Sequence, residues 1–142
     1  MRFGKRVVWL FIFALSLLLL YTCERHGPVE QEGPAEATFS SIQTSIFDQS
    51  CALSGCHRGS DAPVGLDLSE GKSYENLVNV PSREKPSVLR IEPNNADSSY
   101  LVLKLEGAPV IKGEQMPFGR EPLPDGQIDL IRQWIDDGAQ KN

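Results

Sequence analysis

The chain has 142 residues, of which 40% are hydrophobic and 23% are charged. This is the composition of an ordinary globular protein, and the length suffices for one domain with a tail, so no second hydrophobic core is expected. The formal net charge at pH 7 is −5, and such an acidic balance argues against binding to nucleic acid.

The first residues predict an export signal. Arg2, Lys5 and Arg6 precede an almost uninterrupted apolar run over residues 7–21. A basic end followed by a short hydrophobic stretch is typical of a secretory signal peptide. The run is shorter than the ~20 residues that a membrane-spanning helix needs, so a permanent span is the weaker interpretation. We therefore predict a signal peptide over residues 1–22.

The end of this run, Leu20-Tyr21-Thr22-Cys23, resembles a bacterial lipobox. In that motif the chain is cleaved just before the cysteine, which is then lipidated. We therefore predict a lipid on Cys23 that anchors the protein to a membrane on the periplasmic side of the cell envelope. The alternative is ordinary secretory cleavage nearby, and both interpretations predict export.

Residues 23–37 are predicted to form a flexible tether. The stretch ERHGPVEQEGPAEA contains two Gly-Pro pairs, four glutamates and almost no large apolar side chain, so it cannot bury enough surface to fold. The folded domain is therefore expected to cover residues 38–142. His26, in the tether, is most simply a solvated side chain.

Hydrophobic spacing predicts helices at both ends of this domain. The first begins near Thr38, with Ser40 and Gln43 as a capping box. The last is capped by Asp125 and terminated by Gly138. Shorter helices are expected over 69–78 and over 97–105, the second with Asp97 as its cap. Proline-rich, irregular segments separate these helices, and no alternating strand pattern is found.

The segment CALSGCH, residues 51–57, carries candidate ligands. With lipid on Cys23, the odd cysteine count is resolved if Cys51 and Cys56 are bonded to haem, or equally well if they form a disulfide. His57 favours haem, because c-type attachment needs a histidine next to the second cysteine. A zinc knuckle ranks third, because four ligands are needed and few are available.

Haem attachment with this spacing requires a bulge in the chain. The usual motif has two residues between the cysteines, whereas Cys51 and Cys56 are separated by four. On a regular helix these two side chains would point away from each other, so Ser54 and Gly55 are expected to bulge.

An iron held by His57 has a sixth position, and Met116 is the favoured candidate for it. It is the one methionine beyond the predicted signal peptide, and it stands in the glycine- and proline-rich segment GEQMPFGREPLP. Lys112 and His26 are the remaining candidates. The alternative is that Met116 simply covers apolar surface.

Several segments together resemble exported bacterial cytochrome c domains of the planctomycete type. The resemblance covers roughly residues 38–140. It rests on CALSGCH after an amphipathic helix, GLDLSEGKSYENLVNVPS (65–82), LRIEPNNADSSYLVLKLEG (89–107), QMPFG (115–119) and PLPDGQIDLIRQWIDDGA (122–139).

The resemblance implies an all-α, cytochrome c-like fold. The N- and C-terminal helices would cross around one covalently bound haem c, with long irregular loops between them. Cys51 and Cys56 would form the thioether bonds, His57 would be the proximal iron ligand and Met116 the distal one. The crossing would bury Ile46 and Phe47 on the first helix and Ile131 and Trp134 on the last.

The function implied is electron transfer between redox partner proteins, without enzymatic activity. The acidic charge of the exported chain leaves a cationic partner possible. Two alternatives remain: a haem enzyme or gas sensor with an exchangeable sixth ligand, and a haem-free binding module closed by a Cys51–Cys56 disulfide. Arg90 is most simply a solvated residue of a surface loop, and its alternative role is to pair with a haem propionate.

Overall fold

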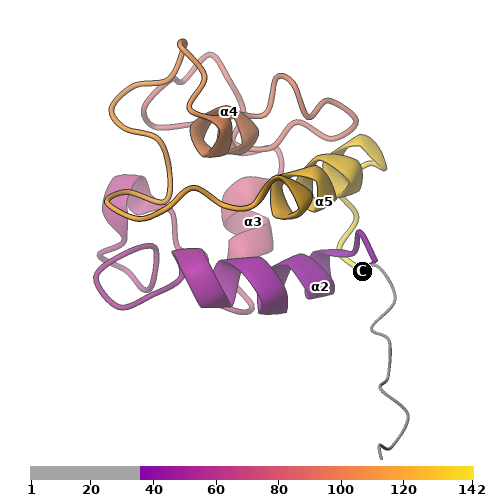
Figure 1. Cartoon of the computed structure of the whole chain (residues 1–142), viewed down its shortest axis with the longest axis horizontal. Coiled ribbons are helices and arrows are strands. Elements are labelled where there is room, and N and C mark those ends of the chain that lie inside the picture. The colour runs from indigo at the N-terminus through magenta and orange to yellow at the C-terminus, as the bar shows by residue number, and fades with distance from the viewer. Residues whose placement is uncertain (1–35) are drawn as a thin grey trace, which may run out of the picture. The chain divides into compact units, whose positions relative to one another are not determined.

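The computed structural model describes residues 36–142 (Figure 1). Its helical elements, in chain order, are α2 (Phe39–Ile42), the π-helix η1 (Gln43–Cys51), the 3₁₀ turn η2 (Pro63–Gly65), α3 (Ser73–Leu77), α4 (Tyr100–Glu106) and α5 (Asp125–Asp136). Within the described range the extended chain forms only two isolated bridges, Val78 with Ile91 and Pro81 with Leu89. The predicted signal peptide, Cys23 and most of the predicted tether lie outside the described residues.

The first predicted helix is the continuous pair α2 and η1. Its cap is Thr38, whose Oγ1 accepts a hydrogen bond from the Ser41 N–H at 3.2 Å. The predicted capping box of Ser40 and Gln43 is therefore wrong. Gln43 is 4% exposed and its Nε2 donates to the carbonyl of Leu68 at 3.0 Å. Its amide therefore forms a hydrogen bond in the core instead of capping the start of the helix.

The last predicted helix is α5, although its N-cap is Pro124 and Asp125 is its first residue. The helix ends just before Gly138, which adopts a φ of +97° that suits glycine. Asp136 lies in the last turn, where a negative charge is normally unfavourable. Its Oδ1 accepts a hydrogen bond from the Ala96 N–H at 2.8 Å, which gives this carboxylate a structural role.

The two middle helices are shorter than predicted, or displaced. α3 starts at Ser73 because the chain turns at Gly71, where φ is +74°. α4 starts after Ser99, so Asp97 is not its cap. Asp97 instead forms an ion pair with Arg132 on α5, and this side-chain contact joins the α4 region to the last helix.

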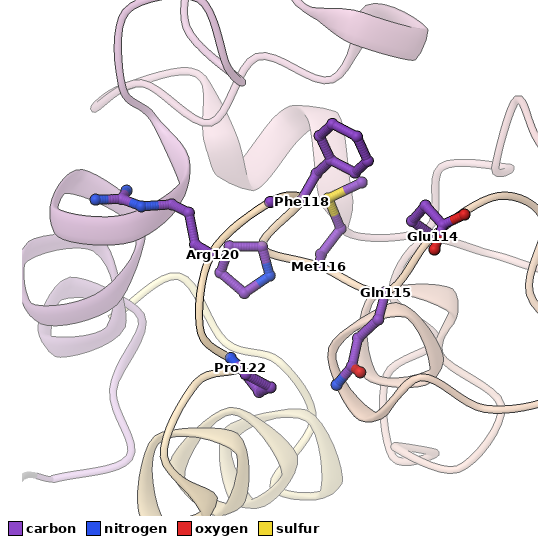
Figure 2. A pocket seen from close by; sticks show the side chains of 8 residues that line it. Glu114, Gln115, Met116, Phe118, Arg120 and Pro122 are labelled. Atoms are coloured by element: carbon purple, nitrogen blue, oxygen red, sulfur yellow. The ribbon is translucent and has the colours of Figure 1, made fainter.

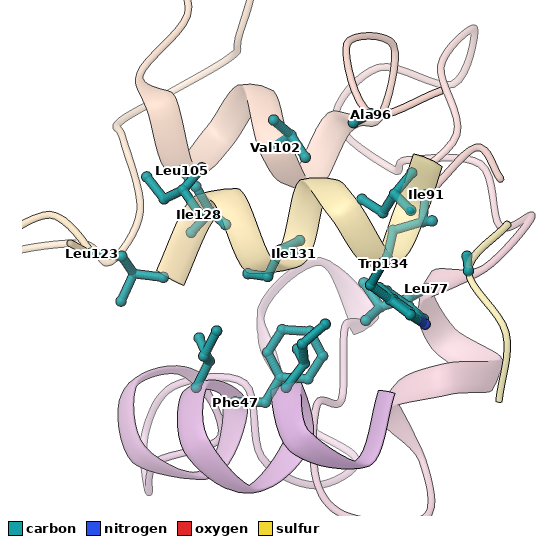
Figure 3. Packing of buried hydrophobic residues seen from close by; sticks show 14 of the residues in the cluster. Phe47, Leu77, Ile91, Ala96, Val102, Leu105, Leu123, Ile128, Ile131 and Trp134 are labelled. Atoms are coloured by element: carbon teal, nitrogen blue, oxygen red, sulfur yellow. The ribbon is translucent and has the colours of Figure 1, made fainter. Parts of the chain in front are cut away.

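The core forms where α5 packs between the first helix and α4. α5 contacts both α2 and α4, and Figure 1 shows it between them. The four residues predicted to be buried, Ile46, Phe47, Ile131 and Trp134, are each at most 1% exposed. Figure 3 shows Phe47 facing α5, with Val102 of α4 on the other side of that helix. No helix among the described residues is long and apolar enough to span a bilayer.

Candidate functional site

The cysteine segment folds back on the end of the first helix. η1 ends at Cys51, and the Cys51 carbonyl accepts a hydrogen bond from the His57 N–H at 3.0 Å. Gly55 has a φ of +80°, with open space where a Cβ would lie. This left-handed residue lets the chain reverse between the two cysteines, at the position where haem attachment would require a bulge.

The imidazole of His57 is oriented by a backbone carbonyl. His57 is half-buried, and its Nδ1 lies 3.1 Å from the carbonyl oxygen of Leu66. A carbonyl only accepts, so Nδ1 carries the proton and donates, which leaves Nε2 free. Burial, the largest cause, lowers the pKa of His57. The Leu66 hydrogen bond and the charge of Glu84 oppose this change, the charges of Arg90 and Lys104 add to it, and the pKa lies below its ordinary value. A neutral ring with one nitrogen fixed by a carbonyl is the usual state of a metal-binding histidine.

The two thiols lie in different environments. Cys51 is half-buried and packs against the hydrophobic core, whereas Cys56 is exposed. Burial, the largest cause, raises the pKa of Cys51 to about 12, and the neighbouring Cys56 also raises it. Neither residue forms a disulfide in the structure.

Met116 reaches the same region from a distant part of the chain. It is half-buried against the core, and its N–H donates to the carbonyl of Lys104 in α4 at 2.9 Å. Figure 2 shows its sulfur beside the ring of Phe118. Phe118 itself is 69% exposed. A hollow of about 350 Å³ lies against the loop formed by residues 114–122.

One cavity of about 330 Å³ is lined by all four predicted haem residues, Cys51, Cys56, His57 and Met116. A volume of this order is typical of small-molecule and cofactor sites. Most of the remaining wall is apolar and comes from residues distant in sequence: Pro63, Val64, Leu66, Leu68, Leu77, Leu101, Leu105, Pro117 and Phe118. The fold thus brings the cysteine motif and the methionine loop to one apolar cavity.

Charged side chains occupy part of the wall. Arg90, Lys104 and Arg120 are the cations that line the cavity, and Glu84 is its carboxylate. Arg90 is only 6% exposed, and its guanidinium donates to the carbonyl of Val64 at 2.9 Å. Arg90 therefore ties two cavity segments together, and it is not merely a solvated surface residue. The excess of positive charge suits a ligand that carries carboxylates.

The donor set fits a c-type haem. Two thiols, an imidazole with a free Nε2 and a thioether face one apolar space, and these are the groups that such attachment and axial ligation use. Within residues 36–142 no group of three or more His, Cys, Asp or Glu side chains has the arrangement of a metal cluster. Lys112, a remaining candidate for the sixth position, is not among the residues that line the cavity.

Sequence reasoning missed Lys104 and Glu84 as cavity residues. A weak signal for Lys104 exists, because it follows Tyr100 by four positions and so lies on the same face of α4. Both residues line the cavity. Glu84 lies in an irregular segment, where residue spacing carries no information about which side chains face inward.

The comparisons with known proteins returned no relatives. No family model matches the chain, and neither the curated proteins nor the solved structures contain a significant match.

Proposed function

We propose that this protein is an exported monohaem cytochrome c that transfers single electrons between redox partner proteins. The observation that carries the proposal is that Cys51, Cys56, His57 and Met116 line one apolar cavity, although Met116 is far from the others in sequence. The protein is proposed not to be an enzyme and not to bind nucleic acid. A lipid on Cys23 would hold it at a membrane on the periplasmic side of the cell envelope.

Each ligand residue has a defined task in this proposal. The thiols of Cys51 and Cys56 would form thioether bonds to one haem c, and His57 Nε2 and Met116 Sδ would be its iron ligands. Bound haem iron supplies a one-electron couple. The Leu66 carbonyl keeps the His57 proton on Nδ1, so the ligand nitrogen stays unprotonated. The largely apolar wall would limit the contact of a bound haem with water.

Covalent attachment is tested by the spectrum of the extracted protein. The chain is expressed with its own leader in a host that carries c-type maturation proteins, extracted with acidified acetone and examined in alkaline pyridine. We expect haem to stay on the chain with a c-type spectrum. Cys51→Ser and Cys56→Ser should each leave one thioether and shift that spectrum, and the double variant should lose its haem on extraction.

A colourless wild-type chain, in a host where a control cytochrome matures, would overturn the proposal. Mass spectrometry then separates the alternatives, because a Cys51–Cys56 disulfide removes two hydrogens from the chain mass. That result would favour the haem-free binding module.

The sixth ligand is tested separately with Met116→Ala. Loss of the thioether should lower the reduction potential and open the ferrous iron to carbon monoxide. Val110→Ala, at an exposed apolar position that does not line the cavity, is the matched control and should keep the iron closed. Rapid carbon monoxide binding by the unaltered ferrous protein would instead favour a haem enzyme or gas sensor with an exchangeable ligand.

A further inference from the structure

The loop that carries Met116 packs on the C-terminal end of α4. An α-helix leaves its last four carbonyl groups without partners inside the helix, and in α4 these belong to residues 103–106. The carbonyl of Leu103 accepts hydrogen bonds from the N–H groups of Gly107 and Ala108. The next two carbonyls need partners from elsewhere in the chain.

Those partners are Met116 and its neighbour Gln115. The Met116 N–H donates to the carbonyl of Lys104 at 2.9 Å, and Gln115 Nε2 donates to the carbonyl of Leu105 at 2.6 Å. Two successive residues of the loop therefore cap two successive carbonyls of the helix. The position of the Met116 backbone is thus fixed relative to α4.

The Gln115 side chain is closely confined. A Cβ added at Gly107 would lie 2.8 Å from Gln115 Oε1, so the amide fills the space that this glycine leaves. Gln115 is half-buried but does not line the cavity. Figure 2 shows the side chains of Gln115 and Met116 extending in different directions. Gln115 therefore contacts the helix end, whereas Met116 faces the cavity.

The other end of the loop is also tied to α4. Lys104 Nζ donates to the carbonyl of Lys112 at 2.8 Å, and the Lys112 N–H donates to the hydroxyl of Tyr100 at 3.0 Å. With these bonds in place, loss of the Gln115 contact should loosen the Met116 end of the loop without releasing all of it.

We infer that Gln115 is a positioning residue that holds the Met116 thioether at the cavity by capping α4 through the Leu105 carbonyl. The inference rests on the proposed function. Gln115 itself would not touch the iron. It acts by limiting how often the loop moves away from α4, and hence how often the sixth position opens to other ligands.

The test compares cyanide binding to the ferric holoprotein in matched variants. Gln115→Glu keeps the side-chain size but removes the donor, and Gln115→Ala removes the whole amide. Gln133→Ala, an exposed glutamine on α5, is the control. We expect cyanide to bind about three- to tenfold faster in both Gln115 variants, the range expected for one lost hydrogen bond. The control should match the wild type.

Hydrogen exchange of the same proteins supplies a readout that does not depend on ligand binding. Peptides covering residues 108–118 should exchange faster in both Gln115 variants, whereas peptides from the first helix should not change. Faster exchange together with an unchanged cyanide rate would overturn the inference, because loosening the loop at Gln115 would then not affect access to the sixth position. Unchanged exchange would overturn it as well.

Failure of the underlying proposal would look different. If the wild type binds cyanide as fast as Met116→Ala does, then Met116 is not the sixth ligand. Both the proposed iron ligation by Met116 and the positioning role of Gln115 are then refuted. If Met116→Ala alone accelerates binding, ligation stands and only the positioning role of Gln115 is refuted.

Discussion

Lys104 Nζ lies 3.3 Å from Glu84 Oε2 in the wall of the cavity, where the Lys104 side chain is only 8% exposed. The same ammonium donates to the carbonyl of Lys112. One buried cation therefore joins three segments: α4, the chain around Glu84 and the loop that leads to Met116.

Removing Lys104 should destabilise the protein strongly. Lys104→Ala leaves Glu84 partly buried without a partner, and we expect the free energy of unfolding to fall by about 2–4 kcal/mol. Arg132→Ala is the comparison. It breaks two ion pairs, to Asp97 and Glu106, but these are more exposed and should cost about 1 kcal/mol or less. Denaturant unfolding measures both losses of free energy. A larger loss for Arg132→Ala than for Lys104→Ala would contradict the prediction that the buried Lys104 contributes more to stability.

Gly107 is expected to tolerate alanine worse than another left-handed glycine. In Gly107→Ala the alanine would have to adopt a φ of +67°, and its Cβ would lie 2.8 Å from Gln115 Oε1. Gly71→Ala, at φ +74°, has nothing within 4 Å and isolates the backbone effect. The backbone term should cost about 1–2 kcal/mol in each variant. The free energy of unfolding, measured with denaturant, should fall further in Gly107→Ala than in Gly71→Ala. Equal losses would mean that the Gln115 side chain moves aside freely.

The buried amide of Gln43 should matter for stability. Its Nε2 donates to Asp48 and to the Leu68 carbonyl, and its Oε1 accepts from Ser73. Gln43→Ala leaves buried groups unpaired, so we expect a loss of about 2–3 kcal/mol in the free energy of unfolding. Gln49→Ala, an exposed position on the same helix, should change it by about 0.5 kcal/mol or less. Similar effects at both positions would show that the Gln43 contacts contribute little.

The two thiols should differ in reactivity before haem is attached. With the pKa of Cys51 at about 12, roughly one Cys51 thiol in ten thousand is a thiolate at pH 8, and burial restricts access further. Iodoacetamide should therefore label exposed Cys56 at least about tenfold faster in haem-free protein. Mass spectrometry of Cys51→Ser and Cys56→Ser separates the two rates, which should converge in denaturant. Equal rates in the native state would contradict the burial of Cys51.

Some features of the fold could be predicted from the sequence because they are local. The spacing of Ile46 and Phe47, and of Ile131 and Trp134, placed these residues on helix faces that are now seen to be buried. Helix starts were less predictable. Thr38 and Ser40 are both good cap residues. The observed cap is Thr38, and the amide of Gln43 forms a hydrogen bond in the core instead of completing a capping box with Ser40.

Candidate ligands were predictable for a different reason. Cysteine, histidine and methionine side chains are chemically distinctive, so Cys51, Cys56, His57 and Met116 stand out by residue type and neighbourhood. No local pattern in the sequence predicts that these four residues line one cavity. It depends on where the irregular chain after α4 returns, and proline- and glycine-rich segments carry no periodicity that predicts this path.

Residue spacing and residue type are local properties, and they were enough to predict the helix faces and the chemical nature of the candidate ligands. Three further features became evident in the folded domain: Met116 lies at the same cavity as His57, Lys104 is buried, and Gln115 caps α4. The physical reason is that these relationships join residues far apart in the chain. The hydrogen bonds and packing that fix them form only when the whole domain folds.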